Sequence, residues 1–477
     1  MAASRDKLLA MIRNGQSMTL GQQLRLTAVL SFPAIVAQLS TIIMQYIDAA
    51  MVGSLGATAS ASIGLVSTST WLFWGLCSAA AMGFSVQVAN RIGANDYRGA
   101  QEVVKQSIIP SLLFSVLLCV VGLIIGPYLP YWLGGDEDVG PGASLYFMIF
   151  TAALPFFQVN YLAGAILRCS GNTFFPGVAN VGMCVLDVIF NFFLIFPSHE
   201  IPVGVTTLTL PGAGMGVAGA ALGTALAEAV TGLVVAWYLW KRNSTLNMRG
   251  FRGTFITSRR CLVRALKIGL PLGAEHLLMC GAQVLITAIV APLGRVAIAA
   301  NAFAVTAESL CYMPGYGISE AATTLVGQSL GAARHELARR FAAITVWSGV
   351  LVMSFMGVVM WVCAPLMMGI ISPVPEICQA GVEVLRIEAW AEPMFAASIV
   401  AYGVFIGAGD TLIPSCMNLG SIWAVRLTLA AWLAPTMGLR GVWIAMAVEL
   451  CFRGAIFLLR LRTDYWMHHL TEKKSIS

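Results

Sequence analysis

Long apolar stretches recur along the whole chain, and each is long enough to cross a lipid bilayer as a helix. One crossing needs about 20 consecutive apolar residues, and short polar turns separate the stretches here. Strands of a membrane barrel would be about half as long, whereas a helix satisfies its own backbone hydrogen bonds within lipid. The pattern predicts twelve helical spans: 26–51, 60–88, 104–130, 143–167, 174–197, 213–240, 266–292, 300–327, 341–371, 382–407, 411–434 and 438–461.

The composition excludes a soluble protein. Hydrophobic residues make up 58% of the 477 residues and charged residues 10%, against roughly 25% charged residues in soluble domains. So few charges could not cover a surface of this size in water, so we predict an all-α polytopic membrane protein with lipid as a partner. The first apolar run begins near Leu26 and is too long for a cleavable signal segment, so it is interpreted as the first span.

Basic residues concentrate on one side of the predicted membrane. Most of the 28 Lys and Arg residues fall in the N-terminal stretch and in every second loop, which indicates that both termini are cytoplasmic. The net charge of +6 follows from this topology, and no nucleic-acid partner is expected. The predicted organisation is a cytoplasmic N-terminal segment 1–25, a six-helix lobe 26–240, a basic cytoplasmic interlobe linker 241–265, a second six-helix lobe 266–462 and a cytoplasmic tail 463–477.

The two halves repeat each other at an offset of 238 residues. Chance matches of Leu or Ala are common between apolar sequences, but matches of Gly, Pro and Asn at one offset are not. The matched pairs include Pro33 and Pro271, Gln45 and Gln283, Gly93 and Gly331, Gly171 and Gly409, Pro176 and Pro414, and Asn180 and Asn418. Each half has an even number of spans, so the copies are related by a pseudo-twofold axis along the membrane normal. Two facing bundles with a cleft between them favour a transporter over a channel.

Three segments resemble the multidrug and toxic compound extrusion (MATE) family of transporters. The stretch 300–332, ending Val326-Gly-Gln-Ser-Leu-Gly-Ala, is similar to the family's eighth helix. Asp48-Ala-Ala-Met-Val-Gly-Ser-Leu-Gly56 resembles its first-helix motif, and the stretch 217–225 resembles its sixth helix. The resemblance covers nearly the whole chain. It implies two six-helix lobes and antiport of organic compounds against sodium ions or protons.

Two carboxylates and an amide are expected at one depth in the first lobe. Asp48 on the first span and Asp187 on the fifth lie roughly 20 Å from the cytoplasmic boundary, and Asn191 follows Asp187 by one turn. Insertion of a carboxylate at the bilayer centre costs about 2.5–3.5 kcal/mol of free energy. Each of these acids is therefore expected to have a structural or functional role. These oxygens could bind Na⁺, or the two acids could share one proton, or each acid could only bond a neighbouring helix. The repeat places Ile286 and Val425 at the equivalent positions, so the scaffold does not require acids there.

The resemblance also implies an ion or proton site on the first and fifth helices. We therefore predict that Asp48, Asp187 and Asn191 couple transport to Na⁺ or H⁺. The order of Asp187 and Asn191 is the reverse of the Asn-then-Asp spacing of some family members.

The second lobe offers further acidic candidates for a cleft or a second cation site: Glu275, Glu308 and Glu392. Some family members use acids on the seventh and tenth helices, but Glu275 falls one turn earlier than that seventh-helix acid, so the role is not carried over. Glu308 is expected about 12 Å inside the outer face, where it could line the cleft and attract cationic substrates. Two neutralising ion pairs are also predicted, one of Arg426 with Glu388 and one of Arg453 with Glu449.

The function predicted from these features is secondary antiport, with export of amphipathic or cationic compounds from the cell across the inner (plasma) membrane. A flippase for lipid-linked oligosaccharides is the alternative, but it would need a cleft lined with basic residues, and only Arg426 and Arg453 lie deep in the spans. An enzyme is not expected, because the chain has no nucleophile with a base and no metal-ligand spacing. No Gly-rich nucleotide-binding loop is present, which argues against a primary ATP-driven pump. No cofactor is expected, and Na⁺ or H⁺ is expected as the coupling ion. We expect a monomer.

Overall fold

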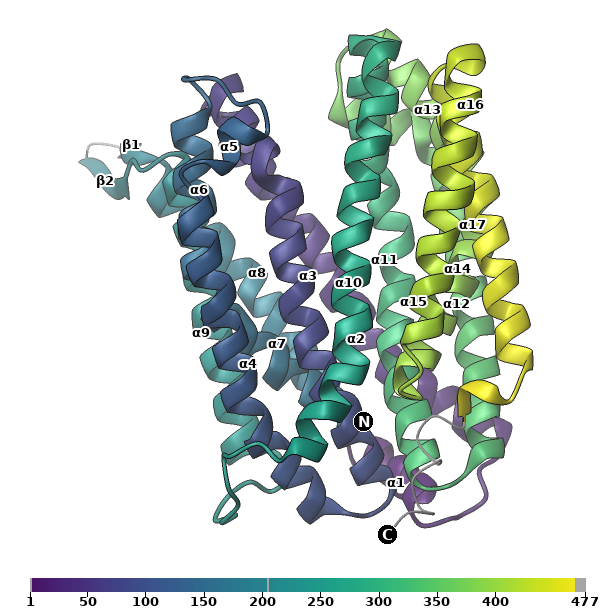
Figure 1. Cartoon of the computed structure of the whole chain (residues 1–477). Helices are drawn as coiled ribbons and strands as arrows, with labels where there is room; N and C mark the ends of the chain where they lie inside the picture. The colour runs from purple at the N-terminus through teal and green to yellow at the C-terminus, as the bar shows by residue number, and fades with distance from the viewer. Residues whose placement is uncertain (1, 204–205, 468–477) are drawn as a thin grey trace.

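The computed structural model describes residues 2–203 and 206–467 as a bundle of long helices with one small hairpin (Figure 1). The elements of the first half are α1 (Ala2–Arg13), α2 (Leu20–Gly53), α3 (Ala57–Gly93), α4 (Tyr97–Ile125), α5 (Leu129–Trp132), α6 (Gly140–Ala152), α7 (Leu154–Cys169), α8 (Phe174–Ile195), β1 (Pro197–Val203), β2 (Thr206–Ala213) and α9 (Val217–Lys241).

The second half continues with α10 (Arg259–Val290), η1 (Ala291–Leu293), α11 (Arg295–Gly331), α12 (His335–Ile371), α13 (Pro375–Ala389), α14 (Glu392–Gly407), α15 (Leu412–Gly420), the π-helical segment η2 (Ser421–Arg426), α16 (Leu427–Met437), α17 (Leu439–Arg462) and η3 (Tyr465–Met467).

These helices confirm the predicted fold class. Ten helical stretches within the described residues are long and apolar enough to cross a membrane, and two further spans are bent helix pairs, which makes up to twelve crossings. Large apolar side chains cover the outer surface, as lipid contact requires and contact with water does not favour. Examples are Leu113, Leu351, Phe355 and Leu366, all more than 60% exposed.

Two spans predicted as continuous, 143–167 and 382–407, are each broken in the middle. The axes of α6 and α7 differ by 47°, and those of α13 and α14 by 61°. Pro155 and Pro393, the second residues of α7 and α14, lack the backbone N–H that would extend the preceding helix. The two breaks occupy equivalent positions of the repeat. Each break therefore begins a new helix inside the membrane.

The repeat appears in the packing between the two halves. Gly93 of α3 lies so close to the backbone of Gln328 that a Cβ would not fit, and Gly331 of α11 lies equally close to the backbone of Asn90. Each contact is the other's counterpart at the 238-residue offset. α3 and α11 therefore meet across the pseudo-twofold axis, close to the end of the molecule where α1 lies (Figure 1).

Helix ends differ from the boundaries of the predicted domains. The expected segment 1–25 contains α1 and the start of α2, whose N-cap Thr19 forms a capping box with Gln22. The expected linker 241–265 contains the first turns of α10, which is capped by Ser258. The outer loop expected over 198–212 lies mostly in the antiparallel hairpin of β1 and β2. Residues 468–477 of the expected tail lie outside the described residues.

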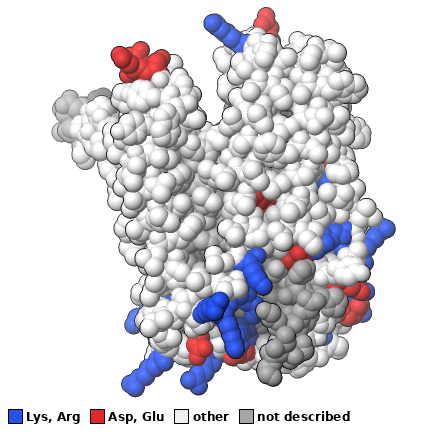
Figure 2. All heavy atoms as spheres, in the orientation of Figure 1, with Lys and Arg blue, Asp and Glu red and all other residues white. Residues whose placement is uncertain are grey.

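Figure 2 shows that Lys and Arg atoms gather at the end of the molecule where α1 lies in Figure 1, and we call it the basic end. It comprises α1 and the loops 94–96, 242–258 and 332–334. At the opposite end a notch separates the two halves in the same view. The halves therefore touch at the basic end and separate at the other.

Candidate functional site

The side chains of Asp48, Asp187 and Asn191, here called the first-lobe trio, meet as the sequence predicts. The Asn191 side-chain nitrogen donates to Asp48 Oδ1 at 2.8 Å and to Asp187 Oδ2 at 3.0 Å. An amide nitrogen has two hydrogens, so one amide can bridge both carboxylates. Asp187 and Asn191 are completely buried, whereas Asp48 is half-buried. The trio therefore has one end towards a cavity and the other in the protein interior.

Packing of α2, α8 and α9 holds this geometry. Asn180, two turns before Asp187 on α8, donates to the Ala37 carbonyl at 3.0 Å and to Thr41 Oγ1 at 2.9 Å, which fixes α8 against α2. Gly223 of α9 lies directly against Asn191 Oδ1, and a Cβ there would collide with it. Asn191 is therefore confined by a neighbouring helix as well as by its hydrogen bonds.

The trio also presents oxygen atoms that a cation could use. Asp187 Oδ1 and Asn191 Oδ1 are buried and have no hydrogen-bond partner among the described residues. Small hard cations prefer oxygen ligands. Within residues 2–203 and 206–467, no cluster of three or more His, Cys, Asp or Glu side chains could hold a metal ion. The trio itself has two carboxylates and an amide, which offer oxygen atoms to a small cation, and each carboxylate can also bind a proton.

A cavity of about 550 Å³ opens beside the trio within the first lobe. Its lining comes from α2, α3, α6, α7, α8 and α9, with Glu320 of α11 contributed by the second lobe. The wall is mainly apolar and aromatic, and Asp48 and Asn191 belong to it. A concave site of this size, with aromatic walls and several polar and charged groups, is typical of a small-molecule site. Trp71, Trp74, Phe150 and Tyr161 are among its aromatic lining residues.

Three charged side chains of this cavity were not among the predicted site residues. Glu228 of α9 accepts a hydrogen bond at 2.6 Å from the side-chain nitrogen of Asn160 on α7. Glu320 forms an ion pair with Arg168 of α7, Nε to Oε2 at 3.4 Å, and accepts a hydrogen bond from Gln38 at 3.3 Å. The signal that could have identified Glu228 is a lone carboxylate in an apolar span.

Glu275 lies in a separate polar network of the second lobe. It accepts hydrogen bonds from the Tyr402 hydroxyl and, at 2.6 Å, from the side-chain nitrogen of Asn418. Arg453 in turn donates to Asn418 Oδ1 at 3.1 Å. Asn418 is the repeat counterpart of Asn180, and Glu275 that of Ala37. Equivalent asparagines therefore join equivalent pairs of helices in the two lobes: Asn180 joins α8 to α2, and Asn418 joins α15 to α10. In the second lobe the asparagine contacts a carboxylate instead of a backbone carbonyl.

Glu308 and Glu392 are buried inside the second lobe with Glu388. The three carboxyl groups interact electrostatically, and all four carboxyl oxygens of Glu388 and Glu392 lack a hydrogen-bond partner among the described residues. None of the three lines the first-lobe cavity, which leaves the cleft role expected of Glu308 without support from this cavity. Glu388 and Glu392 flank the break between α13 and α14.

The predicted ion pair of Arg426 with Glu388 is wrong. Arg426 lies in η2 and pairs with Glu449 of α17, Nη2 to Oε2 at 2.8 Å. The depth of Arg426 along its helix does not determine which neighbour it faces, and η2 packs against α17. The predicted pair of Glu449 with Arg453 is confirmed, with Oε1 and Nε 3.0 Å apart.

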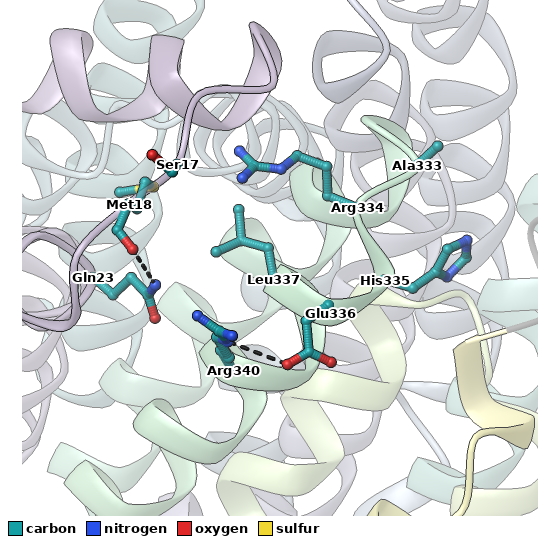
Figure 3. A pocket seen from close by; sticks show the side chains of 9 residues that line it. All are labelled: Ser17, Met18, Gln23, Ala333, Arg334, His335, Glu336, Leu337 and Arg340. Atoms are coloured by element: carbon teal, nitrogen blue, oxygen red, sulfur yellow. Dashed lines mark hydrogen bonds and ion pairs between the residues drawn. The ribbon is translucent and has the colours of Figure 1, made fainter.

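A second cavity, of about 520 Å³, lies at the basic end (Figure 3). It is lined by the linker between α1 and α2 and by the start of α12. Its polar groups are partly satisfied by each other: Arg340 pairs with Glu336 at 3.2 Å, and Gln23 donates to the Met18 carbonyl at 3.0 Å. Arg334 donates to the Met11 carbonyl of α1 at 3.0 Å. We assign no ligand to this cavity.

Comparison with known families gives two matches within this chain. The model of the MatE family matches residues 33–193 and again residues 271–432. The two matched segments start 238 residues apart, which is the offset of the internal repeat. Together they cover more than half of the chain.

The chain is similar over nearly its whole length to curated multidrug resistance proteins. It is 24% identical over 442 residues to the probable multidrug resistance protein NorM of Thermotoga maritima, covering 92% of each chain. It is 27% identical to the probable NorM of Pseudomonas aeruginosa (88% of this chain, 85% of the relative) and 26% identical to the multidrug resistance protein MdtK of Yersinia pestis (91% and 94%).

Solved structures share the fold. A crystal structure of a MATE protein in complex with MaL6 superposes with a TM-score of 0.84 at 22% identity, covering 93% of this chain and 98% of that one. An outward-facing multidrug resistance transporter of the MATE family gives the same TM-score and identity, covering 94% and 98%. The three molecules therefore share one fold.

Proposed function

This chain belongs to the MatE family of multidrug efflux transporters, and from that premise we propose that it exports amphipathic organic cations in exchange for Na⁺ or H⁺ by alternating access. Proteins of this family are transporters, not enzymes. We propose the first-lobe cavity as the substrate site and the first-lobe trio as the coupling site. Both termini are proposed to be cytoplasmic, which makes the notch at the opposite end the outer opening, and the protein is proposed to act as a monomer in the inner membrane.

The observation that carries this proposal is the bridge that Asn191 makes between two acids at the wall of the cavity. Two carboxylates held this close in a medium of low dielectric repel each other when both are ionised. A proton on one of them, or a sodium ion bound by their oxygens, removes that repulsion. The loading of the trio therefore depends on the cation gradient.

Two hydrogen bonds support transmission from the trio to the second lobe. Tyr46, two residues before Asp48 on α2, donates to the Thr306 carbonyl of α11 at 2.7 Å. Gln38, which precedes Tyr46 on α2, donates to Glu320 of α11. A displacement of α2 on cation binding would therefore alter contacts between the lobes. Differential contacts of this kind are what a ligand needs in order to shift a conformational equilibrium.

A flippase for lipid-linked oligosaccharides is not favoured. Its diphosphate substrate would need a basic cavity, whereas among the described residues Arg168 is the single basic one in this lining, and it is paired with Glu320. Asp48, Glu228 and Glu320 give the lining an excess of acids.

The first prediction is that Asp48→Asn abolishes gradient-driven export and leaves folding intact. The amide keeps the size of the side chain but cannot exchange a proton or balance a sodium ion. The measurement is ethidium export from proteoliposomes in which sodium and proton gradients are imposed separately. The wild-type protein should respond to one gradient or both, and the variant should fall to the rate of protein-free vesicles.

Asp138→Asn is the matched control, because Asp138 is an exposed aspartate in the loop before α6. It should export ethidium at the wild-type rate. Wild-type export by Asp48→Asn would refute the role of the trio. The absence of any response of the wild-type protein to either gradient would refute antiport itself.

A further inference from the structure

Glu228 differs from the other carboxylates that line the first-lobe cavity. Asp48 is held in the trio, and Glu320 is paired with Arg168. Glu228 forms no ion pair with any of the described basic side chains, and its hydrogen bond to a neighbouring side chain comes from Asn160, which is neutral. It is only 8% exposed. A carboxylate in this position keeps an uncompensated negative charge beside the cavity, unless something else neutralises it.

The position of Glu228 is set by close packing of α9 on α7. Gly232, one turn after Glu228, would place a Cβ 3.1 Å from the Phe156 carbonyl oxygen and 3.2 Å from Asn160 Cβ. The missing side chain lets the two helices approach, so that Asn160 can donate to Glu228 Oε2. Among the described residues, no hydrogen-bond donor reaches the other carboxyl oxygen, Oε1.

Aromatic rings form the wall next to this carboxylate. Tyr161 directly follows Asn160 on α7 and interacts electrostatically with Glu228. Its ring meets that of Trp74 edge-on, with centroids 5.4 Å apart, and Trp74 meets Trp71 in the same way at 5.6 Å. All three rings line the cavity. Aromatic faces attract cations, and the attraction strengthens when water is excluded.

We propose that Glu228 is the anchor for the positive charge of the substrate, and that the rings of Trp71, Trp74 and Tyr161 receive its aromatic groups. The ligand class is a lipophilic organic cation with one charge surrounded by aryl groups. Such a cation supplies the missing counter-charge and covers apolar wall, whereas a neutral compound of the same size leaves the carboxylate unpaired. This inference rests on the proposed function, because it places the substrate in the first-lobe cavity.

The test measures equilibrium binding to the purified full-length protein in detergent, with no ion gradient. The probes are tetraphenylphosphonium, a permanent cation, and N-phenyl-1-naphthylamine, a neutral dye. Glu228→Gln preserves the shape of the side chain and an oxygen that can accept from Asn160. We expect it to weaken binding of tetraphenylphosphonium about tenfold or more, and to leave the affinity for the neutral dye unchanged.

Two further variants make the result specific. Glu383→Gln removes a carboxylate from a surface ion pair with Arg440, away from the cavity, and should leave both affinities at the wild-type value. Glu228→Asp keeps the charge on a shorter side chain, and its affinity for the cation should lie between those of the wild type and Glu228→Gln. It also provides the measurement if the glutamine variant unfolds.

Two outcomes would overturn the inference. Equal affinity of the wild type and Glu228→Gln for the cation would exclude an anchoring role. If Glu228→Gln weakens the binding of the cation and of the neutral dye equally, the role of Glu228 is structural. Failure of the proposed antiport is a separate result, because binding is measured without a gradient.

Discussion

Glu449 holds two arginines inside the second lobe with one carboxylate. It is completely buried, and it receives Arg426 from η2 and Arg453 from its own helix. Ser421, at the start of η2, donates to it at 2.6 Å. Removal of one partner from a buried ion pair leaves an uncompensated charge, which costs more than the loss of the attraction itself.

We therefore predict a fixed order of destabilisation at this site. Glu449→Gln leaves both arginines without a carboxylate and should lower the free energy of unfolding by about 3–5 kcal/mol. Arg426→Met leaves Glu449 paired with Arg453 and should cost less. Arg440→Met removes an exposed pair with Glu383 and should cost about 1 kcal/mol or less. Thermal unfolding of the purified variants checks the order, and equal effects of all three would contradict it.

At the scale of elements, α1 joins the two lobes at the basic end. Leu9 and Ile12 are buried in one cluster with Leu26 of α2 and Leu325 of α11. Polar contacts extend the junction on both sides. Arg13 donates to the Tyr97 hydroxyl of α4 at 2.7 Å, and Arg334, at the start of α12, donates to the Met11 carbonyl. An opening at the basic end would have to break these contacts.

We predict that Leu9→Ala loosens the basic end, because loss of a buried leucine side chain costs about 2–5 kcal/mol. The reporter is Cys169, a buried residue at the end of α7 whose carbonyl accepts from Gln328 of the second lobe. In a variant that keeps Cys169 as its single cysteine, Leu9→Ala should accelerate labelling by a maleimide. Lys7→Ala changes an exposed residue of the same helix and should not. Equal labelling rates would argue against this role of α1.

At the scale of the whole molecule, few of the ion pairs among the described residues join the two lobes. The ion pair of Arg168 with Glu320 joins α7 of the first lobe to α11 of the second at the wall of the cavity. Next to it, Thr324 of α11 donates to the Arg168 carbonyl at 3.1 Å. Alternating access requires such contacts to form in one state and to break in another.

Reversal of one charge of this pair should shift the equilibrium between the two conformational states, and reversal of both charges should restore it. Arg168→Glu removes an interaction of about 1–3 kcal/mol and should widen the separation of the lobes at the basic end. Spin labels at two exposed positions, Arg98 on α4 and Glu336 on α12, report that distance. The double variant Arg168→Glu/Glu320→Arg should return to the wild-type distribution. If the distance between the spin labels is as long in the double variant as in the single variant, the pair is excluded as an interlobe contact.

Much of the fold can be predicted from the sequence, because it depends on local properties. The hydropathy of each stretch determines that it enters the membrane, and the repeat at 238 residues appears in Gly, Pro and Asn positions without any knowledge of contacts. The first-lobe trio was predictable as a group for the same reason. One turn separates Asp187 from Asn191, and counting along the helix gives the depth of Asp48.

The rest depends on which way a side chain points once the helices are packed. The depth of Arg426 in the membrane could be counted along its helix, but its partner could not. Arg426 lies in the π-helical segment η2 and pairs with Glu449. Glu228 could be identified as an acid in an apolar span, but its neutral partner Asn160 lies 68 residues away. A bilayer imposes spans on any sufficiently apolar chain, so the sequence by itself determined the helices and their repeat. Rotation and close approach of the helices are collective properties of the packed molecule, so only the tertiary structure decided which buried charges are paired and which face the cavity.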